Sequence, residues 1–328
     1  MSALVWLGVA ILVGLTTSAG LAQEAAPLTY VATRQVSGVI HTWGSPQMGD
    51  LLRLYEAGFA KVQPQVRFED SLKSTVTAVA GVYTGRAEIG LLGREIWPVE
   101  EMAFASVEGH APTVVEVATG SYDVPKATFA LMVFVPRGNP LASISMEQLR
   151  RVFGGGAAAV HTWGELGLKG AWAKRPVHLY GFSRDNDKAQ IFSKLVFREG
   201  ESWNCGLREF ANEGAVDAGE LIVRAVEKDP DGVGISNVHY ATAGVRALAV
   251  SAAEGAAIVP SKESVANRSY PLSRAVYVVV DGKTSDAVRE FLRFVLSRQG
   301  QEAVVREGNY LPLTEEIAER ELRKVGAN

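Results

Sequence analysis

Hydroxyl and guanidinium side chains at the ends of predicted strands are the groups in this sequence best suited to chemistry. A serine or threonine hydroxyl donates one hydrogen bond, and arginine offers a planar fork of donors that matches an oxyanion. Unpaired N–H groups at a helix N-terminus add about half a positive charge. Such side chains follow four predicted strands, and they are Ser45, Ser74, Thr75, Arg94 and Arg184.

Ligands of α/β sheets bind beyond the carboxyl ends of the strands, so we expect these side chains to form one anion site. Each of them also has an ordinary structural interpretation. Ser45 has the residue type and position of a helix N-cap, and a lone arginine at a strand end is usually a partner in a surface ion pair. The prediction therefore depends on all four strand ends meeting in one place.

The motifs of common catalytic and nucleotide sites are absent from the sequence. It contains no HExxH, GxxxxGK[ST], GxGxxG, GxSxG or SxxK. The five histidines have no metal-ligand spacing, so we expect each to be structural and predict no metal or cofactor site. The single cysteine, Cys205, excludes an internal disulfide and is expected to be a small buried side chain. The carboxylates leave a hydrolase with a paired acid and base as a minor alternative.

The charge balance excludes two classes of partner. The 328 residues include 33 Lys and Arg against 36 Asp and Glu, which gives a net charge of −3. Nucleic-acid binding needs many basic contacts with phosphates, and a polybasic membrane-surface protein needs the same excess. The chain is 47% hydrophobic, which is typical of a folded globular protein.

The first 22 residues have the pattern of a secretory signal peptide. They carry no charged side chain, and residues 4–15 form an unbroken apolar block. Gly20 and Ala22 provide the small residues of a cleavage site before Gln23. An uncleaved membrane anchor is the alternative, because the uncharged stretch is nearly long enough to span a bilayer. Either interpretation predicts a protein outside the cytoplasm, with the periplasm as the expected location.

Strands and helices alternate along the rest of the chain. Runs of apolar and β-branched residues predict strands over 36–43, 66–68, 89–92, 129–135, 177–182, 232–235 and 275–280. Apolar residues at helical spacing predict helices over 51–62, 76–83, 189–197 and 288–296, and Ser145 with Gln148 forms a capping box before another. This alternation indicates an α/β fold with mainly parallel sheets.

Several longer segments resemble one family. The strongest match runs from Asn139 to Leu166, where N-P-L, S-M-E-Q-L, V-F-G-G and T-W-G-E-L follow in order. Segments 85–94, 232–236 and 270–278 add weaker matches. Together they resemble the phosphate-type periplasmic binding proteins of ABC importers, which have the type II periplasmic binding protein fold. The resemblance covers about residues 36–313.

This resemblance implies an α/β protein of two lobes that binds its ligand in a cleft and catalyses no reaction. Lobe one would comprise 28–134 with 272–328, and lobe two would comprise 135–271. The implied role is to capture phosphate or a related oxyanion, without a cofactor, as a monomer that delivers it to an ABC permease. Ser45 matches the first anion loop of the family. Lobe one would also donate from Ser74, Thr75 and Arg94, and lobe two from Arg184.

The sequence departs from the family at the ligand loops. Arg184 fits the start of the signature R-x-x-G-S-G-T, but Asn-Asp-Lys-Ala at 186–189 replaces its end. Asp187 would bring negative charge near the anion, and Lys188 would offset it. Some members have an Asp where this chain has Arg94, and arginine cannot accept the proton of a phosphate. The identity of the anion therefore stays open, and a signalling or adhesion module without a transported solute is the alternative function.

Overall fold

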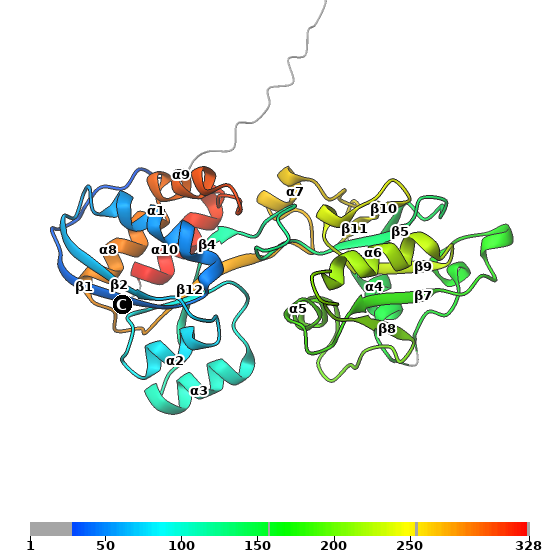
Figure 1. Cartoon of the computed structure of the whole chain (residues 1–328), viewed down its shortest axis with the longest axis horizontal. Coiled ribbons are helices and arrows are strands. Elements are labelled where there is room, and N and C mark those ends of the chain that lie inside the picture. The colour runs from blue at the N-terminus through cyan, green and yellow to red at the C-terminus, as the bar shows by residue number, and fades with distance from the viewer. Residues whose placement is uncertain (1–27, 157, 253–254, 327–328) are drawn as a thin grey trace, which may run out of the picture.

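The computed structural model describes residues 28–156, 158–252 and 255–326. The predicted signal peptide, residues 1–22, lies outside this part of the chain. Two lobes lie side by side, and each is built on its own five-stranded sheet (Figure 1). Among the described residues, no helix is both long and apolar enough to cross a membrane.

The first lobe holds a sheet with strand order β2-β1-β3-β12-β4. These strands are β2 (Gln65–Ser71), β1 (Ser37–Gly44), β3 (Ile89–Leu92), β12 (Ala275–Val280) and β4 (Thr113–Thr119). Its helices are α1 (Gly49–Phe59), α2 (Thr77–Tyr83), α3 (Pro98–Glu108), α8 (Asp286–Val295), α9 (Arg298–Glu307) and α10 (Glu315–Gly326). A large core that includes Phe59 and Phe291 joins the sheet to α1, α8 and α9, and a smaller core around Phe104 joins it to α2 and α3.

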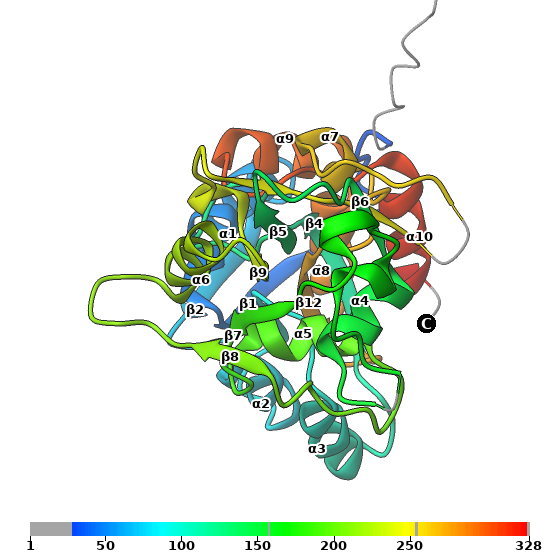
Figure 2. The ribbon, with the colours of Figure 1, turned by 90° about the vertical axis from the view of Figure 1, so that its right-hand side faces the viewer.

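The second lobe holds a sheet with strand order β10-β5-β9-β7-β8. These strands are β10 (Val245–Ala247), β5 (Met132–Pro136), β9 (Gly232–Ser236), β7 (His178–Phe182) and β8 (Leu207–Phe210). Its helices are α4 (Met146–Phe153), α5 (Asp187–Val196), α6 (Ala218–Lys228) and α7 (Lys262–Ala266), and β6 (Ser143–Ser145) pairs with β11 (Ala249–Ser251). Figure 2 views the molecule from this side, so that the second lobe lies in front of the first.

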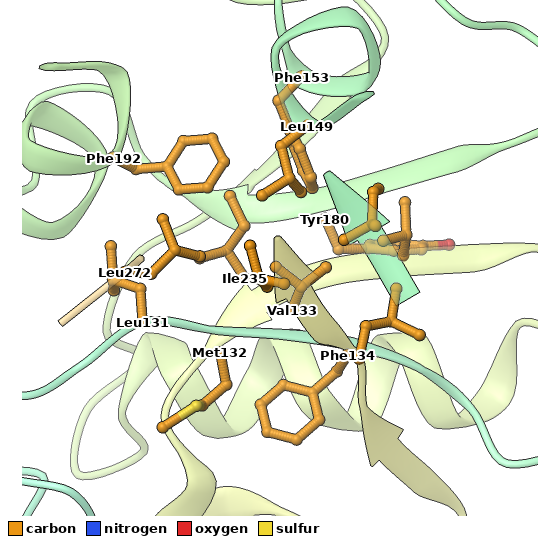
Figure 3. Close-up of a cluster of buried hydrophobic side chains, with 14 of the residues drawn as sticks. Leu131, Met132, Val133, Phe134, Leu149, Phe153, Tyr180, Phe192, Ile235 and Leu272 are labelled. Carbon is orange, nitrogen blue, oxygen red and sulfur yellow. The ribbon is translucent and has the colours of Figure 1, made fainter. Parts of the chain in front are cut away.

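The core of the second lobe is built around β5. Leu131 to Phe134 are fully buried, and the rings of Phe153 and Phe192 meet edge to face above them at 5.3 Å (Figure 3). The predicted capping box before α4 is confirmed, since Gln148 N donates to Ser145 Oγ at 3.1 Å and Ser145 N donates to Gln148 Oε1 at 2.9 Å. One expectation is wrong here: Cys205 is exposed, because it lies in a surface turn before β8.

The α/β fold with two sheet-based lobes is confirmed, and the strand directions refine it. In each sheet one strand runs against the other four: β12 in the first and β5 in the second. These two strands directly follow the segments in which the chain passes between the lobes. The predicted boundary at 134/135 falls inside β5, all of which belongs to the second sheet.

The two crossing segments are hydrogen-bonded to each other. Gly120 N donates to Arg274 O at 2.8 Å, and Leu131 N donates to Leu272 O at 3.0 Å. The two segments therefore lie together between the sheets, where any motion of one lobe against the other has to bend them.

Candidate functional site

A cavity of about 240 Å³ lies between the lobes, beside the crossing segments. Both lobes and both crossing segments contribute to its wall. Four cationic side chains line it against one carboxylate: Arg94, Lys126, Lys188 and Arg274 against Asp187. Glu100 and Glu95 lie outside this lining but pair with Arg94 and Arg274, so the cavity offers an anion several cationic hydrogen-bond donors and only a small net positive charge.

The junction after β1 places the first predicted donor behind the cavity wall. Ser45 N donates to Leu91 O at 3.0 Å, which holds the loop against the end of β3. Gly44 has a φ of 141°, and a Cβ there would lie 2.3 Å from Leu91 O, so only glycine permits this approach. Ser45 is fully buried, and its Oγ has no hydrogen-bond partner within the described part of the chain.

Gly93, which follows β3, brings the cavity close to that hydroxyl. It lines the cavity, and a Cβ on it would lie 2.8 Å from Ser45 Oγ. The adjacent parallel strands β1 and β3 thus end together, as the sequence analysis expected. The Ser45 hydroxyl therefore lies directly behind the part of the wall that Gly93 forms.

The junction before α2 contributes Thr75. Thr75 lines the cavity, whereas Ser74 is absent from the wall that the described residues form. The carbonyl oxygen of Ser74 accepts hydrogen bonds from Thr77 N at 3.1 Å and Thr77 Oγ1 at 2.7 Å, which start the helix. Ser74 therefore has a visible structural role at this junction.

Arg94 lines the cavity, but its guanidinium already has partners. Its Nη1 and Nη2 donate to the Glu100 carboxylate at 2.9 and 2.7 Å, and Nη1 also donates to Glu95 O at 2.8 Å. The same group lies 3.8 Å from the ring centroid of Trp97. The carboxylate of Glu100 offsets most of the positive charge of Arg94. Arg94 therefore contributes more to the rigidity of the cavity wall than to its charge.

Arg184 is not among the residues that line the cavity. Its side chain is 48% exposed, and its Nε lies 2.8 Å from Glu209 Oε1 on β8. Its backbone N–H donates to the other oxygen of the same carboxylate at 3.0 Å. The structure thus brings Ser45, Thr75 and Arg94 together and holds Arg184 on the surface of the second lobe.

The N-terminus of α5 brings a carboxylate and an ammonium group to the cavity. Lys188 Nζ lies 2.9 Å from Asp187 Oδ1, so the predicted offset of one charge by the other is confirmed. Asn186 caps the helix by accepting a hydrogen bond from Lys188 N at 3.0 Å. Burial alone would raise the pKa of Asp187, but the charges of Lys188 and Arg274 outweigh it and hold that pKa below its usual range.

Two cationic residues of the cavity were not predicted from the sequence, Lys126 and the buried Arg274. The Arg274 side chain is only 1% exposed, and its Nη2 lies 2.8 Å from Glu95 Oε2 and 3.6 Å from Asp187 Oδ2. It therefore connects a loop of the first lobe to a helix of the second. Burial would lower its pKa, but Glu95 and then Asp187 reverse the direction, so the guanidinium stays charged. The only sequence signal was its place in the segment resembling Y-P-L-x-R.

A second cavity of about 360 Å³ continues the space between the lobes. It lies between residues 94–98 and α5, and Arg94 and Asp187 line both cavities. Its remaining wall is partly apolar, with Ile96 and Phe197 on opposite sides. The anion-favouring cavity is therefore the inner part of a longer cleft.

Comparison with known proteins identifies the class to which this cleft belongs. A sequence model described as a PBP superfamily domain matches residues 25–299, and the chain belongs to this superfamily. The chain is also 33% identical over 307 residues to the phosphate-binding protein PstS of Pseudomonas aeruginosa, covering 90% of both proteins. It is 28% identical over 201 residues to the protein SphX of Synechococcus elongatus, covering 58% of this chain and 56% of that protein.

Solved structures agree on the fold. PstS of Borrelia burgdorferi superposes with a TM-score of 0.58 at 15% identity, over 85% of this chain and all of that one. An ABC-type phosphate transport receptor of Vibrio cholerae superposes with a TM-score of 0.54 at 15% identity, over 83% of this chain and 99% of that one. The predicted resemblance is confirmed. Because the 33% identical relative PstS is a phosphate-binding protein, the predicted non-catalytic class is confirmed as well.

Proposed function

We propose that this protein is an exported solute-binding protein that captures phosphate, or a closely similar oxyanion, between its lobes and delivers it to an ABC importer. The observation that supports this most is the inner cavity, where cationic hydrogen-bond donors from both lobes and from the crossing segments converge. The 33% identity to a phosphate-binding protein over 90% of the chain points to the same ligand.

Arg274 and Lys188 supply the charge in this proposal, and the hydroxyls of Ser45 and Thr75 supply neutral donors from lobe one. Arg94 shapes the wall. Closure about the crossing segments would bring these groups around the anion and exclude water, which strengthens each charge-assisted hydrogen bond. The moving units are close to the predicted lobes, 28–134 with 272–328 and 135–271. That Ser74 and Arg184 donate hydrogen bonds to the anion stays a prediction.

In this proposal Asp187 makes the cavity selective for anions that carry a proton. Its lowered pKa keeps the carboxylate ionised at neutral pH, so the carboxylate repels an anion that has no proton. Phosphate keeps at least one proton at neutral pH and can donate it to the carboxylate, whereas sulfate cannot. Asp187 could therefore supply the acceptor that Arg94 cannot.

A ligand panel tests this proposal. Thermal unfolding and calorimetry would be measured with phosphate, sulfate, a phosphonate, molybdate and small carboxylates. We expect phosphate to raise the melting temperature most, because a ligand that binds only the folded state stabilises it. A flat response across the panel would contradict the proposal.

Export and delivery need separate tests. The superfamily match begins at residue 25, just after the predicted cleavage at Ala22. N-terminal sequencing of the secreted protein should begin at Gln23, whereas an anchored protein would stay with the membrane. Delivery predicts that the chain restores phosphate uptake to cells that retain the matching permease but lack their own binding protein.

One observation favours the alternative, a signalling or adhesion module without a transported solute. Asp187 already pairs with Lys188 and Arg274, and Asn186 caps the helix that points at the cavity. The charges there are partly neutralised without any ligand. This alternative predicts no binding across the ligand panel.

A further inference from the structure

A cluster of one histidine and two carboxylates lies at the end of the first sheet away from the cleft. Glu108 is the last residue of α3, His110 follows it, and Asp281 comes directly after β12. One oxygen from each carboxylate and one imidazole nitrogen all lie within 4.8 Å of one another. Three groups of metal-ligand type from two distant parts of the chain thus converge on one point.

The hydrogen bonding of His110 determines which nitrogen faces the carboxylates. His110 Nδ1 lies 3.0 Å from Ala111 O, and a carbonyl oxygen only accepts, so Nδ1 carries the hydrogen. In a neutral imidazole Nε2 is then a lone pair, and it lies 3.2 Å from Asp281 Oδ1. That oxygen is buried and accepts no hydrogen bond within the described residues. Two lone pairs facing each other require a cation or a proton between them.

The charges around the cluster point the same way. In the described part of the chain, neither Glu108 nor Asp281 forms an ion pair with a lysine or an arginine. Glu108 also lies at the C-terminus of α3, where the helix dipole is negative, and the last turn of α3 holds no basic residue. A divalent cation would remove this unfavourable concentration of negative charge.

His41 gives an internal contrast. Its Nδ1 lies 3.0 Å from Glu88 Oε2 and its Nε2 lies 3.4 Å from Glu69 Oε2, so both nitrogens face carboxylates. The two carboxylates therefore lie on opposite sides of the His41 ring and do not converge on one nitrogen. At His110 a carbonyl lies at Nδ1 and Asp281 lies at Nε2, while an oxygen of Glu108 lies within 4.8 Å of the ligand atoms of both. A carbonyl on the nitrogen that does not bind the metal is the usual arrangement of a metal-binding histidine.

We propose that Glu108, His110 and Asp281 bind one divalent transition-metal ion of the Zn²⁺ type, with water as the fourth ligand. The 3.2 Å between His110 Nε2 and Asp281 Oδ1 is close to the edge of about 3.3 Å of a tetrahedron with ~2.0 Å bonds. A nitrogen and oxygen donor set favours such ions over Mg²⁺ or Ca²⁺, which prefer oxygen alone. The ion would tie the end of α3 to the end of β12.

Calorimetry with ZnCl₂ on the full chain, without an affinity tag and in phosphate-free buffer, tests this site. We expect one Zn²⁺ per chain, a raised melting temperature, and much weaker binding of Mg²⁺ and Ca²⁺. His110→Ala should weaken Zn²⁺ binding at least ~100-fold, because loss of even an outer partner of a ligand costs ~10–100-fold. Glu108→Gln should weaken it as well, and X-ray absorption should detect only nitrogen and oxygen ligands.

His41→Ala is the matched control and should leave Zn²⁺ binding unchanged. The proposal is overturned if Zn²⁺ does not bind with this stoichiometry, or if His110→Ala binds as the parent does. It is also overturned if NMR finds His110 doubly protonated with Zn²⁺ present. Phosphate binding in the cleft is measured separately, so failure of one proposal leaves the other open.

Discussion

The two lobes contribute different chemistry to the cleft. The first lobe brings mainly neutral groups: the hydroxyls of Ser45 and Thr75, and Gly93, which has no side chain to fill the cavity. Arg94, which also lines the cavity, is paired with Glu100, and Lys126 lies on a crossing segment outside both sheets. The second lobe brings formal charges close together in Asp187 and Lys188.

Arg274, on the segment between the lobes, contacts Glu95 of the first lobe and Asp187 of the second. A hydrogen bond to a neutral hydroxyl weakens within a few tenths of an ångström, whereas a charge acts over a longer range in a partly enclosed space. The first lobe therefore depends on exact backbone geometry, which Gly44 supplies. The second lobe can lose the family's glycine-rich loop and still present charge.

The largest expected effect follows from removing Arg274. Arg274→Ala takes away the buried charge between the lobes and leaves Glu95, which is only 15% exposed, without its partner. We expect at least ~100-fold weaker phosphate binding, and a fall of about 3–5 kcal/mol in the free energy of unfolding. Calorimetry and urea unfolding measure the two effects. Arg274→Lys keeps the charge without the fork and should be intermediate, and unchanged affinity in Arg274→Ala would remove this residue from the site.

Gly44→Ala tests the geometric demand of the first lobe. The added Cβ would lie 2.3 Å from Leu91 O at a φ of 141°, so the loop has to move. Backbone strain alone should lower the free energy of unfolding by about 1–3 kcal/mol, and phosphate affinity should fall as Ser45 shifts. Gly38→Ala is the matched control, since Gly38 has a φ of 127° but open space around its Cβ position. Equal losses in the two variants would show that the contact with Leu91 does not matter.

Asp187→Asn tests how the second lobe chooses an anion. Without the carboxylate, sulfate is no longer repelled, and we expect sulfate affinity to rise by about 10-fold relative to phosphate. The pKa of Asp187 lies below its usual range, so discrimination in the parent should hold through neutral pH and fail only as acid protonates this group. Competition calorimetry from pH 8 down to about pH 3 measures both the change in relative sulfate affinity and the loss of discrimination in acid. Asp185→Asn, at an exposed neighbour, should have no effect.

Arg184→Ala has the smallest expected effect on phosphate affinity. It tests whether Arg184 binds the anion, as the sequence predicts, or serves only in the surface ion pair that the structure shows. The residue forms an exposed pair with Glu209, and such pairs contribute about 0–1 kcal/mol. We expect a change of less than about 2-fold in phosphate affinity. Complete loss of binding would instead establish Arg184 as the donor that the family resemblance implies, and would require a larger closure of the lobes.

The regular elements were largely predictable because their signals are local. The strands at 89–92 and 275–280 match β3 and β12 to the residue, and the capping box of Ser145 forms as expected. The run at 129–135 was less accurate, since β5 begins only at Met132. Residues 129–131 are as apolar as β5 but belong to a crossing segment that is buried in the core of the second lobe. Apolar character alone cannot distinguish a buried crossing segment from a buried strand.

The site was predictable only in part. Alternating elements placed Ser45 and Thr75 at strand ends, and parallel neighbours bring such ends together. Asp187 and Lys188 were recognised as charges near the ligand because they interrupt a family motif. Arg274 and the cluster around His110 were missed, since their partners lie far away in the sequence.

Residue order by itself determined the α/β alternation, the family and the small residues that the junctions after β1 and β3 require. These properties depend on propensity, periodicity and steric limits within a few residues. Tertiary structure alone decided which charges meet: Arg274 with Glu95 and Asp187, and Arg184 with Glu209 instead of the cleft. The physical reason is that electrostatic interaction depends on distance through space and on burial, and neither quantity is encoded in sequence spacing.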